Sequence, residues 1–454
     1  MKLKNTAVIL LAAVIFCFSG CNVTDLSFED SLRPPKTMGD EAEIEKLISD
    51  TAKGKYVLKY PKSGTYRSAI IMNDLDGDGV NEAIAFFRGK DDTAEIHMLV
   101  MYDIDGEWKI SGDYVTETTD VDCVDFADID ENDGLEIMVG YATYTPNINF
   151  LACYTYSDGV TDTISAGQNY SSFCCGNLDN NSKSEIMTLT LFNAETESRA
   201  SMLEYNKDKN QIYVKSVAPM DPNVVKFKNI GLTDIDATVK GVVVDGSYAG
   251  EETITQVIYY NQALAILKNP LYNDKQKNPT LRTSGVLSTD FDGDSKLEIP
   301  IVEKLPYRGE QMAQTIADKI SWCAFNIKTE TLAIKNIVAK HYKCNFSVKK
   351  PDRWQEGTYT AVITDNSMKL YEWLQTNLGE ELFEIKVFDV AAWDQGKVDG
   401  YTLIYRDNHY AYAFSNPRGQ SPMKLTNDEI KTAFSADNPD SEPQREVTPT
   451  NEND

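Results

Sequence analysis

The chain has 454 residues, with 44 basic and 70 acidic side chains and a formal net charge of −26 at pH 7. A charge of this sign and size repels phosphate backbones and anionic lipid headgroups, so we expect no nucleic-acid partner. The length exceeds what one hydrophobic core usually serves, so we expect two or more cooperating units.

The N-terminus has the pattern of an export signal. Lys2 and Lys4 precede an apolar run from residue 7 to residue 18, and small residues then lead to Cys21. The apolar run is too short for a comfortable transmembrane helix. Residues 1–20 are therefore predicted to be a signal peptide.

The segment Phe18-Ser19-Gly20-Cys21 resembles the lipobox of bacterial lipoproteins, with Phe as a less usual first residue. The resemblance implies cleavage before Cys21, lipidation of its sulfur, and attachment of the exported chain to the outer face of the bacterial cell membrane. Two acyl chains make such an anchor stable. Simple secretion and an uncleaved signal anchor are the alternatives. Cleavage would remove two lysines and no acids, leaving a net charge of about −28.

Residues 21–54 are expected to form a tether and a short helix near residues 41–50, and residues 55–340 then carry an acidic repeat. Its copies are "DLDGDGVNEAI" from Asp74, "DIDENDGLEIM" from Asp128, "NLDNNSKSEIM" from Asn177, "DIDATVKGVVV" from Asp234 and "DFDGDSKLEIP" from Asp290. The intervals are 54, 49, 57 and 56 residues. Short apolar runs precede the copies, and strand-like runs follow them. Four short strands in about every fifty residues are typical of a propeller blade.

The unit of strand, Asp-x-Asp-x-Asp/Asn loop, Glu-Ile/Ala and strand resembles the FG-GAP and VCBS repeats found in the β-propellers of integrin α subunits and many bacterial surface proteins. It covers about residues 66–340. Together with the lipobox, the stretch "LRPPKTMGDEAEIEKLI" resembles a group of clostridial VCBS-type lipoproteins. The resemblance implies a mainly β fold built as a β-propeller. The five recognisable loops predict about five blades of four antiparallel strands, and up to seven if degenerate copies are present, followed by a small C-terminal α+β domain.

The acidic residues of the first loop have the spacing of a cation site. Carboxylates at loop positions 1, 3 and 5 crowd together only around a hard cation, and Ca²⁺ takes six to eight oxygen ligands. The first loop supplies these as Asp74, Asp76 and Asp78, with the Val80 carbonyl at position 7 and Glu82 at position 9. Glycines at positions 4 and 6 are expected to adopt the positive φ angles that fold the oxygens inward.

Other copies repeat this ligand pattern to different degrees. We predict further Ca²⁺ sites at Asp290, Asp292, Asp294 and Glu298, at Asp128, Asp130, Asn132 and Glu136, and, more weakly, at Asn177, Asp179, Asn181 and Glu185. The copy at Asp234 keeps Asp236 but has Thr238 and Val242 at positions 5 and 9, so no ion is expected there.

Three interpretations of these loops compete. EF-hand or dockerin loops would continue into amphipathic helices, whereas strands follow here. Acidic turns without metal are common in hairpins, because Asp and Gly suit turn geometry. We favour the third interpretation, a structural Ca²⁺ ion that holds consecutive strands together and has no catalytic duty.

Residues 341–436 depart from the repeat and predict a small α+β domain. Its strands have hairpin turns at Asp365-Asn366 and Asp407-Asn408, and Thr426 with Glu429 forms a capping box that opens a helix. Residues 437–454 are acidic, almost free of aliphatic side chains, and predicted to be disordered.

The cysteines and histidines carry no recognisable chemistry. The spacings of Cys123, Cys153, Cys174, Cys175, Cys323 and Cys344 fit no zinc pattern, so most are expected to be small buried residues. One or two disulfides are the alternative in an exported protein. The three histidines are scattered, and no nucleophile or phosphate-loop motif is found.

These observations favour a non-catalytic, lipid-anchored cell-surface binding or adhesion module, with a protein or glycan ligand, on a calcium-stabilised propeller. Two alternatives stay open. One is a polysaccharide-active enzyme, because a catalytic carboxylate pair could hide among so many acids. The other is a sensor or assembly subunit of an envelope complex that binds through the C-terminal domain.

Overall fold

The computed structural model describes residues 39–90, 95–132, 134–145, 147–194, 196–248, 251–273, 277–396 and 398–436. The predicted signal peptide, Cys21 and the acidic tail lie outside the described residues. Within them, no helix combines the length and the apolar character needed to cross a membrane.

The described chain is mainly β, and its strands form five sheets. The first contains β1 (Tyr56–Leu58), β2 (Ile70–Asn73), β3 (Glu82–Gly89), β4 (Glu95–Ile104) and β5 (Glu107–Glu117). The second contains β6 (Val121–Ala127), β7 (Glu136–Ala142), β8 (Asn149–Ser157), β9 (Val160–Tyr170), β10 (Ser172–Gly176), β11 (Glu185–Thr190), β12 (Arg199–Asn206) and β13 (Gln211–Pro219). The third contains β14 (Val224–Asp234), β15 (Lys240–Tyr248), β16 (Glu252–Asn261) and β17 (Ile266–Lys268).

The last two sheets belong to the C-terminal part of the chain. The fourth contains β18 (Ile299–Lys304), β19 (Asp318–Asn326), β20 (Thr331–His341), β21 (Phe346–Lys349) and β27 (Phe434–Ala436). The fifth contains β22 (Tyr359–Ile363), β23 (Ser367–Trp373), β24 (Leu378–Asp389), β25 (Thr402–Arg406) and β26 (Tyr410–Ser415). The α-helices of the described chain are α2 (Asp40–Thr51), α3 (Glu310–Ala313), α4 (Val390–Asp394) and α5 (Asn427–Ala433), and η2 (Lys207–Lys209) is a 3₁₀ turn.

The sheets are built from a repeated unit of four antiparallel strands, which we call a blade. Blades 1 to 4 are β2–β5, β6–β9, β10–β13 and β14–β17. The second sheet is two blades joined where β9 and β13 pair in parallel at Ser165 and Gln211. Blade 5 begins with an isolated bridge between Thr289 and Glu298 and continues through β18, β19 and β20. The predicted class, mainly β with repeated four-stranded antiparallel blades, is confirmed.

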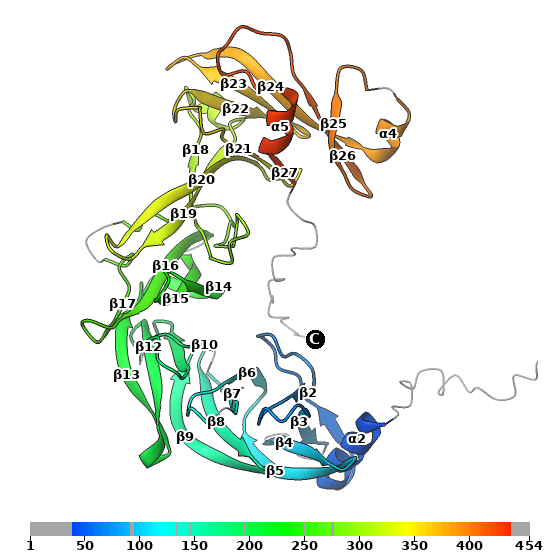
Figure 1. Ribbon diagram of the computed structural model, residues 1–454, viewed down its shortest axis with the longest axis vertical. Helices are drawn as coiled ribbons and strands as arrows, with labels where there is room; N and C mark the ends of the chain where they lie inside the picture. Colours follow the sequence, from blue (N-terminus) through cyan, green and yellow to red (C-terminus); the bar gives the residue numbers. More distant parts are fainter. Residues whose placement is uncertain are drawn as a thin grey trace, which may run out of the picture.

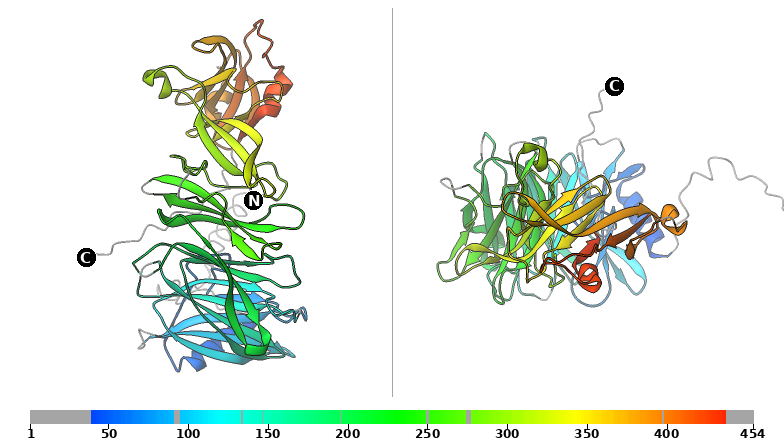
Figure 2. Two further views of the ribbon diagram at one scale, coloured as in Figure 1. Left: turned by 90° about the vertical axis from the view of Figure 1, so that its left-hand side faces the viewer. Right: turned by 90° about the horizontal axis from the view of Figure 1, so that it is seen from above.

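The blades follow one another along an arc in chain order (Figure 1). The left-hand view of Figure 2 shows the blades stacked along the long axis of the molecule. First strands lie beside first strands, since β6 contacts β10 and β10 contacts β14. Fourth strands do the same, since β5 contacts β9 and β13 contacts β17. Equivalent loops of successive blades are therefore neighbours.

The hydrophobic cores lie between adjacent blades. In β7, Ile137 and Val139 pack on blade 1, whereas Met138 packs on blade 3. In β15, Val242 faces blade 3 and Val243 faces blade 5. Alternate side chains of a strand point to opposite faces, so a strand that is covered on both faces is apolar at nearly every position. This explains the continuous apolar runs after the acidic loops.

Helix α2 covers the outer face of the first sheet and replaces a preceding blade there. Ile44 and Ile48, one turn apart, are both buried against side chains such as Phe87 and Leu99. The helix is the one expected near residues 41–50.

The C-terminal segment shares a sheet and a core with blade 5. β21 pairs with β20 on one side and with β27 on the other. Leu305 and Ala339 of the blade lie in the same hydrophobic cluster as Phe383 and Ile430. The predicted boundary after residue 340 therefore falls at the end of β20, and β21 beyond it continues the sheet.

Local signals in this segment behave as expected. The turns at Asp365-Asn366 and Asp407-Asn408 join β22 to β23 and β25 to β26. The capping box forms, because Thr426 accepts the Glu429 N–H and Glu429 accepts the Thr426 N–H. The six cysteines of the described chain are free thiols. Cys153 and Cys323 are fully buried and the other four are only partly buried, so the expectation that most are buried is wrong.

Candidate metal centre

Four of the five acidic loops close in the same way. The residue before each loop pairs with the glutamate at position 9: Asn73 with Glu82, Ala127 with Glu136, Gly176 with Glu185, and, as an isolated bridge, Thr289 with Glu298. The glutamate Oε2 then accepts the backbone N–H at position 2, from Leu75, Ile129 and Leu178 at 2.8 Å and from Phe291 at 2.9 Å. All four glutamates are at most 3% exposed. Glu82, Glu136 and Glu185 begin strands, whereas Glu298 is a bridge residue directly before β18, and each glutamate holds its loop in place.

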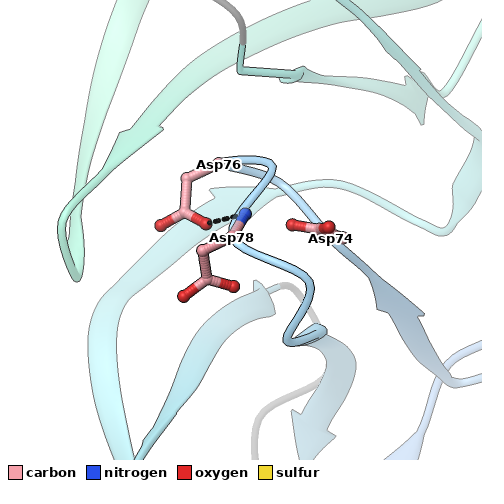
Figure 3. A group of neighbouring side chains, drawn as sticks. All are labelled: Asp74, Asp76 and Asp78. Atoms are coloured by element: carbon pink, nitrogen blue, oxygen red, sulfur yellow. Dashed lines mark hydrogen bonds between the residues drawn. The ribbon is translucent and has the colours of Figure 1, made fainter.

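In the first loop, the aspartates hold the backbone in a tight coil (Figure 3). Asp74 accepts the N–H groups of Gly77 at 2.8 Å and Gly79 at 3.0 Å. Asp78 accepts the N–H of Val80 at 2.7 Å. Carboxylate oxygens from positions 1, 3 and 5 lie within 4.8 Å of one another, so Asp74, Asp76 and Asp78 could hold a metal ion together. The Val80 side chain points to solvent.

The loop backbone adopts the left-handed conformation at position 4 in all four cases. The residues there are Gly77 (φ 75°), Glu131 (φ 67°), Asn180 (φ 58°) and Gly293 (φ 79°). The positive φ angles expected for the glycines are confirmed, including that of Gly79 at position 6 (φ 89°). Because Glu131 has a Cβ in this conformation, the coil forms there against an intrinsic backbone preference.

Two further groups of side chains could hold a metal ion. One is Asp128, Asp130 and Glu136, and the other is Asp290, Asp292 and Asp294, each with ligand atoms within 4.8 Å of one another. Asn132 lies beside the first of these groups, where its side-chain amide donates to Asp130. Glu298 closes the second group's loop.

The loop at Asn177 holds fewer charges. Its two amides turn toward the loop itself, since Asn177 donates to the Asn181 carbonyl and the Asn181 amide donates to Glu185 Oε1 at 3.3 Å. Asp179 instead forms an ion pair with Lys215. Among the described residues this loop does not assemble a group of three acidic ligands.

Burial makes three of these glutamates difficult to ionise. It raises the pKa of Glu82, Glu136 and Glu185 to about 7, and the backbone N–H at position 2 opposes that rise in each. For Glu82, the charges of Asp76 and Asp78 add to the increase in pKa. Because a bound cation favours the charged form of a carboxylate, it would offset this cost.

Lysines form ion pairs with the carboxylates of two of the four loops that end in a buried glutamate. The Lys335 Nζ lies 2.8 Å from Asp292, 2.8 Å from Asp294 and 3.0 Å from Glu298. The Lys215 Nζ lies 2.5 Å from Asp179. Sequence reasoning missed both lysines, which lie on β20 and β13, because they follow the paired aspartates at different separations. Only the strand pairing brings them to the loops.

In the other two of the four loops, no described lysine forms an ion pair with a carboxylate ligand. Lys207 donates to the amide oxygen of Asn132 at 2.9 Å at the second loop. Within the described chain, no ion pair involves Asp74, Asp76 or Asp78, whereas the carboxylates of the blade 5 loop are paired. Among these four loops, the first therefore has only oxygen ligands and no described ion pair between its aspartates and a lysine.

The copy at Asp234 is a tighter turn. Strand pairing extends to Asp234 and Lys240, which leaves residues 235–239 in the loop. Asp236 accepts the N–H groups of Thr238 at 2.8 Å and Val239 at 2.9 Å. Val242 lies in the buried core. That no ion binds here stays a prediction.

The acidic loops connect neighbouring blades. The Leu135 N–H, in the second loop, donates to the Leu75 carbonyl in the first at 2.6 Å, and the Ser184 N–H in the third donates to the Asp128 carbonyl in the second at 2.7 Å. The Leu297 N–H in the blade 5 loop donates to the Thr233 hydroxyl of blade 4 at 2.9 Å. An ion in such a loop would brace two blades.

No family model and no curated protein matches this chain. Solved structures with some similarity include a protein from Lactobacillus plantarum (8% identity, TM-score 0.27, covering 65% of this chain and 85% of that one) and an exotype rhamnogalacturonan lyase (11%, 0.28, 72% and 74%). Sqt1 of Saccharomyces cerevisiae is another (8%, 0.31, 80% and 98%).

Proposed function

We propose that this protein is a non-catalytic, lipid-anchored cell-surface binding module whose blades are braced by Ca²⁺, with a protein or glycan as its ligand. The observation that carries the proposal is the position of the acidic loops at the boundaries between blades. Their carboxylates accept hydrogen bonds from the loop backbone, and the glutamates at position 9 are buried where the strand pairing begins. An ion held this way stabilises a scaffold.

The ligand chemistry of the first loop supports Ca²⁺. Asp74, Asp76, Asp78 and Glu82 offer only oxygen, and the Val80 carbonyl would add one more. Hard oxygen ligands select Ca²⁺, Mg²⁺ or Mn²⁺ over softer metals, and an irregular loop suits the flexible coordination of Ca²⁺ better than the strict octahedron of Mg²⁺. The resemblance to FG-GAP and VCBS repeats points the same way.

To test the binding role, the chain lacking residues 1–20 is labelled with a fluorophore, and its retention on cells is measured. We expect saturable retention on cells of the producing species, which is competed by unlabelled protein. Loss of retention after protease treatment of the cells would identify a protein ligand, and loss after periodate a glycan ligand. Release of soluble sugar fragments from envelope polysaccharide, without saturable retention, would instead favour the polysaccharide-active enzyme.

The anchor is tested by Cys21→Ala. Because this substitution removes the only sulfur at the predicted cleavage site, labelled fatty acid should no longer be incorporated, and the protein should move from the membrane to the soluble fraction. A matched Cys344→Ala substitution, far from the signal, should leave labelling unchanged. Lipid labelling that persists in the Cys21→Ala protein would refute the lipobox interpretation.

A further inference from the structure

We propose that Lys335 takes the place of a metal ion in the acidic loop of blade 5, so that this side chain decides that the loop binds no metal. The inference rests on the proposed calcium role of the acidic loops, and it divides them into loops that take an ion and loops that take an ammonium group. Lys215 plays the corresponding part in blade 3.

The contacts of Lys335 are those of a bound cation. Its Nζ reaches Asp292, Asp294 and Glu298, at loop positions 3, 5 and 9, at 2.8, 2.8 and 3.0 Å. An ammonium group has three N–H donors, and three carboxylates are present to accept them. A metal ion would need the same oxygens at 2.3–2.6 Å, so it and the ammonium group exclude one another.

The lysine reaches the loop from a β-bulge. In the pairing of β19 with β20, Trp322 faces Asn336 and Cys323 faces Ile334, which leaves Lys335 without a partner residue. An extra residue in one strand bends the strand and redirects its side chain. The bulge therefore presents the long lysine side chain to the loop of its own blade.

Blade 3 repeats this arrangement independently. Met202 faces Ser216 and Leu203 faces Val214, so Lys215 is the extra residue of β13. Its Nζ lies 2.5 Å from Asp179, at position 3 of the loop, and 3.0 Å from Glu204. Two blades thus place a lysine at the same structural position and direct it to the same loop position.

Blades 1 and 2 have no cation at this bulge. In blade 1, Val100 faces Gly112 and Met101 faces Ile110, so the extra residue is Ser111. In blade 2 the shift leaves residues 165–167 of β9, which are Ser, Ala and Gly. The bulge residue therefore distinguishes the loops of blades 1 and 2 from those of blades 3 and 5. In the described chain, no lysine forms an ion pair with the carboxylate ligands of the first two loops, although Lys207 donates to the amide oxygen of Asn132 in the second.

The test counts the Ca²⁺ ions bound to each protein by equilibrium dialysis followed by elemental analysis. It compares the wild type with variants at Lys335, all prepared as the chain lacking residues 1–20. We expect Lys335→Met and Lys335→Ser each to bind one ion more than the wild type. The serine variant reproduces the residue that blade 1 has at this bulge. Lys335→Arg should bind the same number of ions as the wild type. Asp292→Asn added to Lys335→Met should remove the extra ion. Thermal melting in Ca²⁺ confirms that each variant is folded, and two different replacements guard against failure of one to fold.

Equal ion numbers in the wild type and both neutral variants would overturn the inference, as would a wild-type ion that Asp292→Asn removes. The proposed calcium role is judged separately by Asp76→Asn, which should cost one ion at the first loop. If Asp76→Asn costs none while Lys335→Met gains one, the calcium assignment of the first loop fails and the role of Lys335 stands.

Discussion

Removal of Ca²⁺ with a chelator should lower the melting temperature of the chain lacking residues 1–20, and added Ca²⁺ should restore it better than added Mg²⁺. The carboxylate oxygens of Asp74, Asp76 and Asp78 lie within 4.8 Å of one another, and Glu82 of the same loop is buried. Without the ion, these carboxylates repel one another and destabilise the loop. A ligand that binds only the native state stabilises it by about 2.7 kcal/mol when its free concentration is a hundredfold above the dissociation constant. Calorimetry with and without chelator measures this difference.

Two aspartate variants test whether the first loop is responsible for the response of the melting temperature to Ca²⁺. Asp76→Ala should remove much of the response to Ca²⁺, because it removes a ligand at position 3 of the first loop. Asp236→Ala is the matched control at position 3 of the loop in which Asp236 serves as a turn acceptor for Thr238 and Val239. It should leave the response to Ca²⁺ intact. An unchanged melt after chelation, with no calcium found in the purified protein, would show that the acidic loops are turns alone.

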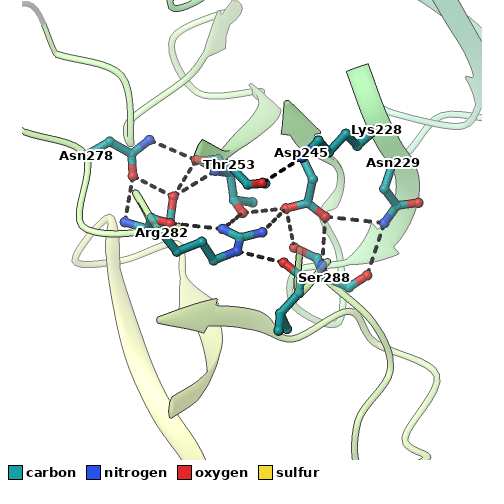
Figure 4. Close-up of polar contacts among 10 residues, drawn as sticks. Lys228, Asn229, Asp245, Thr253, Asn278, Arg282 and Ser288 are labelled. Carbon is teal, nitrogen blue, oxygen red and sulfur yellow. Dashed lines mark hydrogen bonds and ion pairs between the residues drawn. The ribbon is translucent and has the colours of Figure 1, made fainter. Parts of the chain in front are cut away.

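Arg282→Leu should lower the free energy of unfolding by about 3–5 kcal/mol, the usual cost of leaving one charge of a buried pair without its partner. Arg282 and Asp245 are in contact at 2.9 Å, and both side chains are 0% exposed. Figure 4 shows the surrounding contacts. Asp245 also accepts the backbone N–H of Ser288 at 2.7 Å and the Thr255 hydroxyl at 2.5 Å.

This pair fastens the long connection between the third and fourth sheets. Arg282 forms a bridge with Thr253 of β16 and donates to the carbonyls of Thr280 and Val286 at 2.9 and 2.7 Å. Ser288 directly precedes the bridge residue Thr289 that opens blade 5. Loss of Arg282 should therefore loosen the start of blade 5 as well as destabilise the core.

Arg406→Ala is the matched control, because Arg406 forms a comparable ion pair with Asp394 at 2.8 Å on the surface. Exposed pairs contribute about 0–1 kcal/mol, so this variant should unfold nearly as the wild type does. In a double-mutant cycle, Asp245→Asn with Arg282→Leu should cost less than the sum of the single changes, since neither charge is then left alone. Equal losses for Arg282→Leu and Arg406→Ala in chemical denaturation would contradict the prediction.

Much of this fold was readable from local sequence. The Asp-x-Asp loop followed by a strand identified the β-blade repeat, because the loop and the strand pairing that closes it are formed by consecutive residues. The same holds for the left-handed Gly77 and Gly79 and for the capping box at Thr426. In each case the interacting groups are a few residues apart, so their spacing along the chain is also their geometry.

The tertiary structure alone decided which partner meets each loop. Lys335 lies 41 residues beyond Asp294, and Lys215 lies 36 beyond Asp179, and both arrive through a bulge whose register depends on the packing of whole strands. The sequence predicted similar ion sites at the blade 1 and blade 5 loops, and only the structure shows that a lysine stands in one of them. The buried pair of Asp245 and Arg282, 37 residues apart, has the same origin. The number of charged residues can be counted in the sequence. Which of them contact one another is set by long-range strand pairing and burial, and these depend on the whole chain.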